Sequence, residues 1–195
     1  MPGRSTLLEF KGSDPLILMA PPRFAADAML GRLARWLRVL GFDTTYDSAI
    51  ADPDLVRLAD REERILLTRD RHLLRELRPA RSLEVRRDAP LEQLRDVVTA
   101  LDLTPPAELF TRCLVCNTPL TSPLSVAEAE RLLPAGAGGL SGAVRRCVAC
   151  GRVYWQGSHV RRMLRALERA LPGWSGHATP NEPTDMSPPE ARHYL

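Results

Sequence analysis

Four cysteines in the C-terminal half of the chain have the type and spacing of a metal site. They form two Cys-x-x-Cys pairs and are all the cysteines in the sequence. Each pair can turn two thiolates toward one ion, and two pairs complete the tetrahedral sulfur shell that zinc prefers. Two disulfides are disfavoured in a reducing cytoplasm, and a redox pair would explain only one of the motifs. We therefore expect a structural zinc ion held by Cys113, Cys116, Cys147 and Cys150.

Aspartates form a second candidate site, in the N-terminal half. Asp27, Asp47 and Asp70 each follow a segment with strand character, and in a parallel sheet such positions gather at the edge that binds ligands. Carboxylates gathered there repel each other unless a cation such as Mg²⁺ or Mn²⁺ lies between them. A divalent cation at such a site suits phosphodiester hydrolysis. Asp52 and Asp54, at the start of a helical segment, could supply a further ligand. The alternative is that Asp27, Asp52 and Asp70 only cap helices.

Strands and helices must alternate for these aspartates to meet. The helical patterns follow short apolar or β-branched segments, and the strand candidates are 23–26, 42–46, 65–68 and 83–86. This alternation predicts a three-layer α/β fold, with a parallel sheet between helices on both faces. In a strand order 2-1-3-4 the first and third strands are neighbours, and Asp27 and Asp70 then flank the crevice between them.

The remaining sequence suggests two modules. We expect an irregular arm at 1–22, the α/β domain at 23–104, a zinc ribbon with a following basic helix at 110–171, and a disordered tail at 172–195. Between the cysteine pairs, a helical insert at 125–133 precedes a flexible segment at 134–142. No apolar run approaches the roughly 18 residues of a membrane span, and no export signal is credible. We therefore expect a cytoplasmic protein with no membrane partner.

Basic and aromatic side chains near both sites favour a nucleic-acid partner. Lys11 is the only lysine among 27 basic residues, and arginine suits phosphate and base contacts, although a GC-rich genome would give the same skew. Three arginines of the helix after Asp27 could hold phosphates or simply face solvent: Arg32, Arg35 and Arg38. Four side chains after the second cysteine pair suit base stacking and phosphate pairing: Arg152, Tyr154, Trp155 and His159. The two aromatics could equally cover the small core of a ribbon.

These motifs together resemble the Mut-seven C-terminal RNase family, which belongs to the PIN-like nucleases. The similarity covers residues 23–163 and includes the run from Asp27 to Asp43, Tyr46-Asp47, Ile65-Leu-Leu-Thr-Arg-Asp70, Arg112-Cys-Leu-Val-Cys-Asn117 and the segment from Cys147 to His159. The resemblance implies a PIN-like fold with an appended zinc ribbon. It also implies a ribonuclease activity that uses acidic residues with Mg²⁺ or Mn²⁺.

The resemblance assigns roles to particular residues. Asp27 matches the first-strand acid of PIN-like nucleases, and Thr68-Arg69-Asp70 matches their strand-terminal Thr-x-Asp motif. Asp70 would then be a metal ligand, Thr68 would orient it or the attacking water, and a further acid would come from Asp47, Asp52 or Asp54. His72 stands where many PIN-like relatives have an acid. That departure favours an alternative function, a non-catalytic RNA-binding or ribosome-associated adaptor.

Overall fold

The computed structural model describes residues 21–133 and 143–176. The arm up to residue 20, the segment 134–142 and the tail beyond residue 176 lie outside the described residues, so the expectations for them stay predictions. Within the described residues, no helix is long and apolar enough to cross a membrane.

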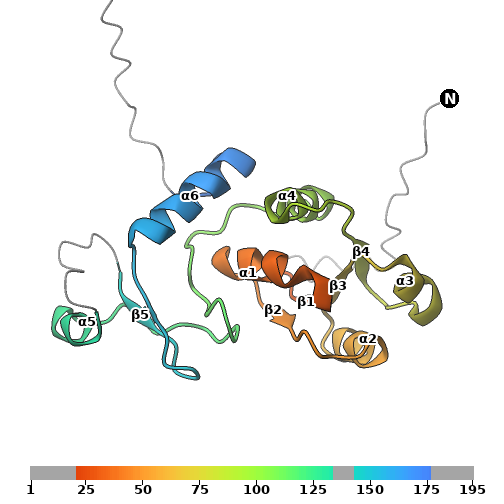
Figure 1. Cartoon of the computed structure of the whole chain (residues 1–195), viewed down its shortest axis with the longest axis horizontal. Coiled ribbons are helices and arrows are strands. Elements are labelled where there is room, and N and C mark those ends of the chain that lie inside the picture. Colours follow the sequence, from red (N-terminus) through yellow and green to blue (C-terminus); the bar gives the residue numbers. More distant parts are fainter. Residues whose placement is uncertain (1–20, 134–142, 177–195) are drawn as a thin grey trace, which may run out of the picture.

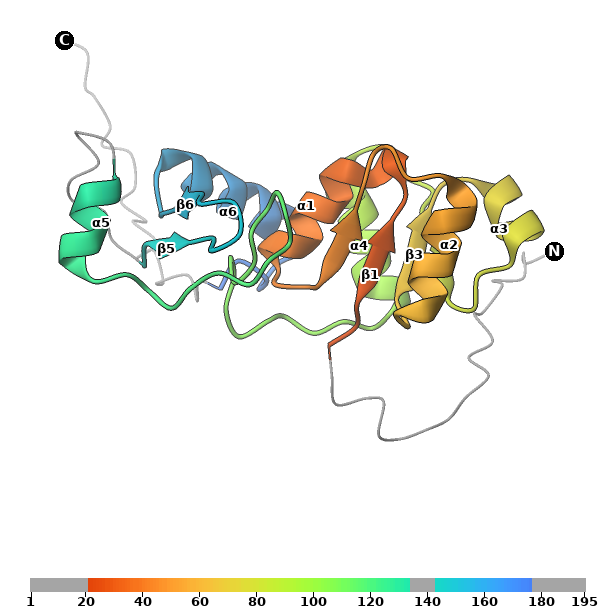
Figure 2. The same ribbon diagram turned by 90° about the horizontal axis from the view of Figure 1, so that it is seen from below.

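Four short strands form one parallel sheet, as the alternating pattern predicts. They are β1 (Phe24–Ala26), β2 (Thr44–Tyr46), β3 (Ile65–Thr68) and β4 (Ser82–Glu84), in the order β2-β1-β3-β4. Ala26 at the end of β1 is paired with Tyr46 on one side and with Leu67 on the other. The carboxyl ends of β1 and β3 are therefore neighbours, in the order 2-1-3-4 that was considered from the sequence, and the residues after these strands lie side by side (Figure 2).

Helices cover both faces of this sheet (Figure 1). They are α1 (Gly31–Val39), which follows the 3₁₀ turn η2 (Ala28–Leu30), then α2 (Asp52–Arg61), α3 (Arg71–Leu77) and α4 (Pro90–Ala100). Successive strand side chains point to opposite faces, so Phe24 and Ala26 pack with α1 and α4 whereas Ala25 packs with α2 and α3. The three-layer α/β architecture is thus confirmed.

The cysteines lie in a second, smaller part of the structure. It contains α5 (Val126–Leu132), the antiparallel pair β5 (Arg145–Arg146) and β6 (Val153–Tyr154), and α6 (Ser158–Ala170). Helix α5 begins with a capping box, in which Ser125 and Glu128 satisfy each other's backbone N–H groups. The predicted helical insert between the cysteine pairs is therefore present, and the arrangement is compatible with a zinc ribbon.

The chain beyond α6 differs from the expectation of a disordered tail starting at residue 172. Leu167, Leu171 and Trp174 are buried in the same core cluster as Phe24 of β1, and Trp174 is 7% exposed. The carboxylate of Glu168 accepts hydrogen bonds from the N–H groups of Gly173 and Ser175, which fixes the turn after the helix. Pro172 and Gly173 precede Trp174 and break the helical pattern, so the sequence does not indicate that Trp174 packs with Leu167 and Leu171. The packed structure therefore extends to residue 176.

Direct contacts join the cysteine-bearing part to the sheet. The N–H of Thr44, on the edge strand β2, donates to Oδ1 of Asn117 at 3.1 Å, so a side chain satisfies a donor that the sheet leaves open. Arg112 donates to the carbonyl oxygen of Gly41, and the N–H of Phe110 donates to that of Val39 at the end of α1. The second part is therefore docked on α1 and β2 and is more than a tethered module.

Candidate active site and metal centre

The hydroxyl of Thr68 connects the two aspartates that follow β1 and β3. Asp27 is 6% exposed, and its Oδ2 accepts a hydrogen bond from Thr68 Oγ1 at 2.6 Å. The same oxygen of Thr68 accepts the backbone N–H of Asp70 at 2.9 Å. A hydroxyl has one proton, so this pairing aims it at the Asp27 carboxylate. Asp27, Thr68 and Asp70 therefore form one hydrogen-bonded unit at the carboxyl edge of the sheet.

Helix capping accounts for only one of the three aspartates to which it could apply. Asp70 is the N-cap of α3, where its Oδ1 accepts the N–H groups of His72 and Leu73 at 2.6 and 3.2 Å. Asp27 precedes η2 but makes no side-chain cap bond, and Asp52 lies inside α2, whose N-cap is Ala51. In the described residues Thr68 is the one side chain bonded to the Asp27 carboxylate. A nearly buried carboxylate whose negative charge is balanced by a single hydrogen bond is a suitable ligand for a cation.

The further acids considered from the sequence lie apart from this unit. Asp47 is exposed and its Oδ1 accepts the N–H of Ala49, and Asp54 is exposed and paired with Arg57. Over residues 21–133 and 143–176, the cysteine quartet is the only set of three or more His, Cys, Asp or Glu side chains with ligand atoms all within 4.8 Å. The structure thus does not gather Asp47 or Asp54 with Asp27 and Asp70 at that distance.

Glu84 is an acid at the same edge that the sequence reasoning missed. It ends β4 and is paired in register with Thr68. The sequence pattern extended that strand to residue 86, which placed Glu84 inside the strand when it is in fact at its end. Arg71 and Arg86 donate to its carboxylate at 2.7 and 3.2 Å, and these bonds, that of Arg71 foremost, hold the pKa of Glu84 below its usual range. Its carboxylate is already paired.

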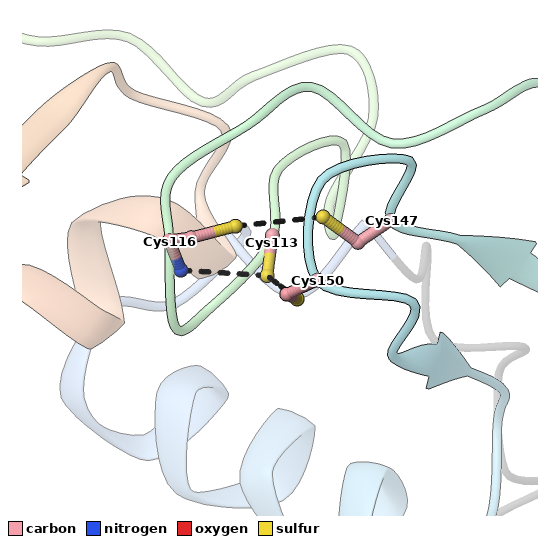
Figure 3. Close-up of side chains that lie close together, drawn as sticks. All are labelled: Cys113, Cys116, Cys147 and Cys150. Carbon is pink, nitrogen blue, oxygen red and sulfur yellow. Dashed lines mark hydrogen bonds between the residues drawn. The ribbon is translucent and has the colours of Figure 1, made fainter.

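The four cysteines come together as predicted (Figure 3). Sγ of Cys113 lies 3.6 Å from that of Cys150, and Sγ of Cys116 lies 3.4 Å from that of Cys147. Disulfide sulfurs would be about 2.05 Å apart. Tetrahedral zinc with bonds of about 2.3 Å requires sulfur separations of roughly 3.8 Å, close to those found. The cluster has the size and donor chemistry to hold a metal such as zinc.

The surroundings of these thiols differ. Hydrogen bonding with the Thr118 hydroxyl lowers the pKa of Cys116 to about 6, and the N–H of Arg152 lowers the pKa of Cys150. Burial raises the pKa of Cys147 to about 11. The surroundings thus favour the thiolate form of Cys116 and Cys150 and disfavour that of Cys147, and a metal cation bound among the four sulfurs would stabilise the Cys147 thiolate.

One predicted substrate-binding arginine has a different role. Arg38 is 4% exposed, and its guanidinium donates to the carbonyl oxygens of Thr44, Leu114 and Val115 at 2.9, 3.1 and 2.9 Å. It therefore cannot hold a substrate phosphate, and the sequence-based assignment is corrected. The helix pattern places Arg38 off the apolar stripe, but the cysteine-bearing part covers that side of α1. Arg32 and Arg35 are exposed.

The four predicted substrate-binding residues after the second cysteine pair also differ in exposure and contacts. Arg152 and His159 are exposed, and Trp155 is half-buried. The Tyr154 hydroxyl lies 3.0 Å from Sγ of Cys113 and accepts the N–H of Leu114, and burial raises the pKa of Tyr154. A neutral tyrosine here can donate to the Cys113 thiolate, which is a supporting contact for a metal ligand.

Comparison with known protein families gives a match over most of the chain. A family model described as the Mut7-C RNAse domain matches residues 22–167, which is more than half of the chain and includes both the acidic edge and the cysteine cluster. No curated protein and no solved structure matches the chain.

Proposed function

Because this chain belongs to the Mut7-C RNAse domain family, we propose that it hydrolyses phosphodiester bonds of RNA at the edge formed by Asp27, Thr68 and Asp70. Family membership indicates a ribonuclease role and RNA as the substrate. The observation that supports this location of the active site is the hydrogen bonding of the Thr68 hydroxyl, which connects Asp27 and Asp70 at the neighbouring ends of β1 and β3. Open α/β sheets bind their ligands at such a crevice.

The donor atoms at this edge fit a hard divalent cation such as Mg²⁺ or Mn²⁺. Asp27 and Asp70 would hold it, and phosphate oxygens of the substrate commonly complete such a shell. When bound, such an ion lowers the pKa of water and stabilises charge on the phosphate. Of the Asp70 carboxylate, Oδ1 caps α3, which leaves Oδ2 for a ligand. Asp47 or Asp54 would act as a further acid, through water or after a change in side-chain conformation.

Thr68 and two arginines would assist by positioning. The Thr68 hydroxyl fixes the rotation of the Asp27 carboxylate, so that the ligand oxygens are preorganised before substrate arrives. Arg32 and Arg35 are exposed on α1, the helix that follows Asp27 and η2, and would hold the phosphates of the approaching strand. The proposed catalytic domain spans residues 23–104.

The zinc ribbon at 110–171 would grip the substrate. Four thiolates fill the shell of a zinc ion and leave no open position, so this metal would be structural. Arg152 would pair with phosphates, and Trp155, Tyr154 and His159 would contact bases. Arg38 and Asn117 dock this part on the catalytic domain, so RNA held by one would be presented to the other.

One observation favours a second candidate function. In the described part of the chain, Asp27, Asp70 and a third acid do not form a set whose ligand atoms all lie within 4.8 Å of one another, and His72 at the start of α3 is exposed. An acidic edge this sparse would suit an adaptor that binds RNA without cutting it. The adaptor uses the same arginines and ribbon and differs only in the absence of hydrolysis.

Cleavage of labelled single-stranded RNA in Mn²⁺, Mg²⁺ or EDTA separates the two functions. The nuclease predicts metal-dependent cutting that is lost in the Asp27→Asn Asp70→Asn double variant, while RNA affinity is kept. Asp102→Asn is the matched control, because Asp102 is exposed and has a φ of 48° that asparagine tolerates well. Binding without cutting under every metal condition would establish the adaptor.

A further inference from the structure

A cavity of about 460 Å³ lies between the β5–β6 hairpin and α6. Its wall is mostly apolar, with Val153 from β6 and Val160, Met163 and Leu164 from α6, and the aromatic residues Tyr154 and Trp155 line it as well. Pockets of 300–1,000 Å³ with a few polar groups in an apolar wall are typical of small-molecule sites. The cavity is therefore large enough to enclose a ring system, beyond the surface stacking that the hairpin sequence suggests.

Three polar residues that line the cavity have side chains with no hydrogen-bond partner in the described residues. They are the indole N–H of Trp155, the amide of Gln156 and the imidazole of His159. Arg145, which also lines the cavity, is already held by the carbonyl oxygen of Thr121 and by the carboxylate of Glu108. Unpaired donors and acceptors beside apolar and aromatic surface match a flat ring with a hydrogen-bonding edge. A nucleobase is such a ring.

The charge around the cavity indicates how the rest of the ligand is built. Residues 143–171 contain seven arginines and a single acid, Glu168, and the acid that lines the cavity, Glu108, is paired with Arg145. Arg161, Arg162 and Arg165 are exposed on α6, the helix that forms one wall. A surface with this excess of positive charge attracts a polyanion. It offers no electrostatic attraction to a peptide that is uncharged or has few acidic residues. The base would therefore arrive on a phosphate backbone.

We propose that this cavity receives one unstacked nucleobase of a single-stranded RNA, whose phosphates run along the arginines of α6. The inference rests on the proposed function for the nature of the substrate. Base-paired RNA is excluded from the cavity, because its bases are stacked and their edges are occupied. Arg38 and the contact of Phe110 with Val39 fix the cavity at the far end of α1 from Asp27. The position of the captured base would thus determine which phosphodiester bond of the RNA strand lies at the edge formed by Asp27 and Asp70.

Filling the cavity tests this directly. In the Asp27→Asn Asp70→Asn background, which prevents cutting, Met163→Trp adds bulk to the cavity wall without changing charge. Leu132→Trp is the matched control, since Leu132 is 40% exposed on α5 and does not line the cavity. We expect Met163→Trp to bind a labelled single-stranded oligonucleotide between about fivefold and about a hundredfold more weakly, and Leu132→Trp to bind it normally. The slope of affinity with salt should stay unchanged in both, because no arginine is removed.

Oligonucleotides with a single abasic position identify the base itself. One position should weaken binding by the same factor as Met163→Trp, and the two changes together should weaken it no further. Equal binding of all abasic oligonucleotides, or equal affinity of Met163→Trp and Leu132→Trp, would overturn the proposal. Displacement of the RNA from the cavity by a peptide of residues 177–195 would instead assign the cavity to the chain's own C-terminal segment.

Two controls keep these outcomes separable. Zinc content and melting temperature report whether Met163→Trp is folded, and if it is not, Gln156→Leu removes a base-edge partner with little change in bulk. Cutting is measured on the chain with its aspartates intact. If one abasic position weakens binding but the intact chain does not cut RNA, the cavity proposal stands and the nuclease is refuted. If the intact chain cuts RNA but no abasic position weakens binding, the nuclease stands and the cavity proposal is refuted.

Discussion

Nη1 of Arg38 lies 3.1 Å from the carbonyl oxygen of Leu114, a residue 76 positions away. Leu114 stands between Cys113 and Cys116, so a buried side chain of α1 holds the backbone of the first cysteine pair. The Nε of the same guanidinium donates to the carbonyl oxygen of Thr44 on β2. Burial lowers the pKa of Arg38 from its ordinary value, but the group stays charged at any physiological pH. One cation thus couples the cysteine cluster to the sheet.

Replacing Arg38 should therefore cost stability. Arg38→Met removes three hydrogen bonds and leaves carbonyl oxygens without a donor, so we expect the free energy of unfolding to fall by about 2–4 kcal/mol in a urea titration. Arg35→Met, on the exposed side of the same helix, is the control and should change it by less than about 0.5 kcal/mol. If Arg38→Met weakened RNA binding and left stability unchanged, the sequence-based role in phosphate binding would be restored.

Thr68 should matter through its hydroxyl. Thr68→Val keeps the shape but removes the donor to Asp27 and the acceptor for the Asp70 N–H, and we expect RNA cleavage to fall by about 10–100-fold. Thr68→Ser retains the hydroxyl and should keep most of the rate. The comparison is made on single-turnover rates with saturating metal and circular dichroism as a fold check. Equal activity of the two variants would show that the bridge is not used in catalysis.

Asp70 combines capping with ligand chemistry, and two substitutions separate them. Asparagine is as good an N-cap as aspartate, so Asp70→Asn should leave the melting temperature nearly unchanged while abolishing cutting. Asp70→Ala loses both functions and should lower the free energy of unfolding by about 0.5–2 kcal/mol more. A large loss of stability in Asp70→Asn would contradict this division, because it would mean that the negative charge itself stabilises the fold.

Metal removal should unfold the cysteine-bearing part. We expect one zinc per chain by elemental analysis, and loss of that zinc in Cys147→Ser or after chelation should lower the melting temperature by about 10 °C or more. Val148→Ser changes an exposed residue of the same cysteine pair and should keep its zinc and its melting temperature. Full stability in the metal-free protein would show that the sulfur cluster needs no ion.

The contacts of Asp43 predict that the protein loses stability at acidic pH. Burial acts to raise its pKa, but hydrogen bonds from Arg64 and Asn117 outweigh this and lower the pKa below its ordinary 3.8. A carboxyl with a depressed pKa in the folded state contributes stability above the unfolded pKa and loses it as pH falls through the folded value. The free energy of unfolding should therefore decline below about pH 4. That decline should be shallower in Asp43→Asn and unchanged in Asp102→Asn, as measured by urea unfolding from pH 5 to pH 2.5.

Local sequence patterns predicted much of the fold and part of the candidate site. The alternation of strand and helix segments predicted the sheet correctly, since the crossover rule leaves few topologies for such a chain. It also placed Asp27 and Asp70 directly after strands, and the strand order of the structure makes those strand ends neighbours. The position of Glu84 was missed because strand ends are set by pairing, and a shift of two residues moves a side chain from the middle of the sheet to its edge.

By itself, the sequence determined the cysteine cluster and the alternation of strands and helices, because both depend on spacings of a few residues and on short connections. Only the tertiary structure decided that Arg38 is buried, that Trp174 belongs to the core and that a cavity lies against α6. A helix pattern shows which face is polar or apolar, but it cannot show which distant segment will cover that face. Arg38 looked exposed because its partners lie 76 and 77 residues further along the chain, and only packing brings them to it.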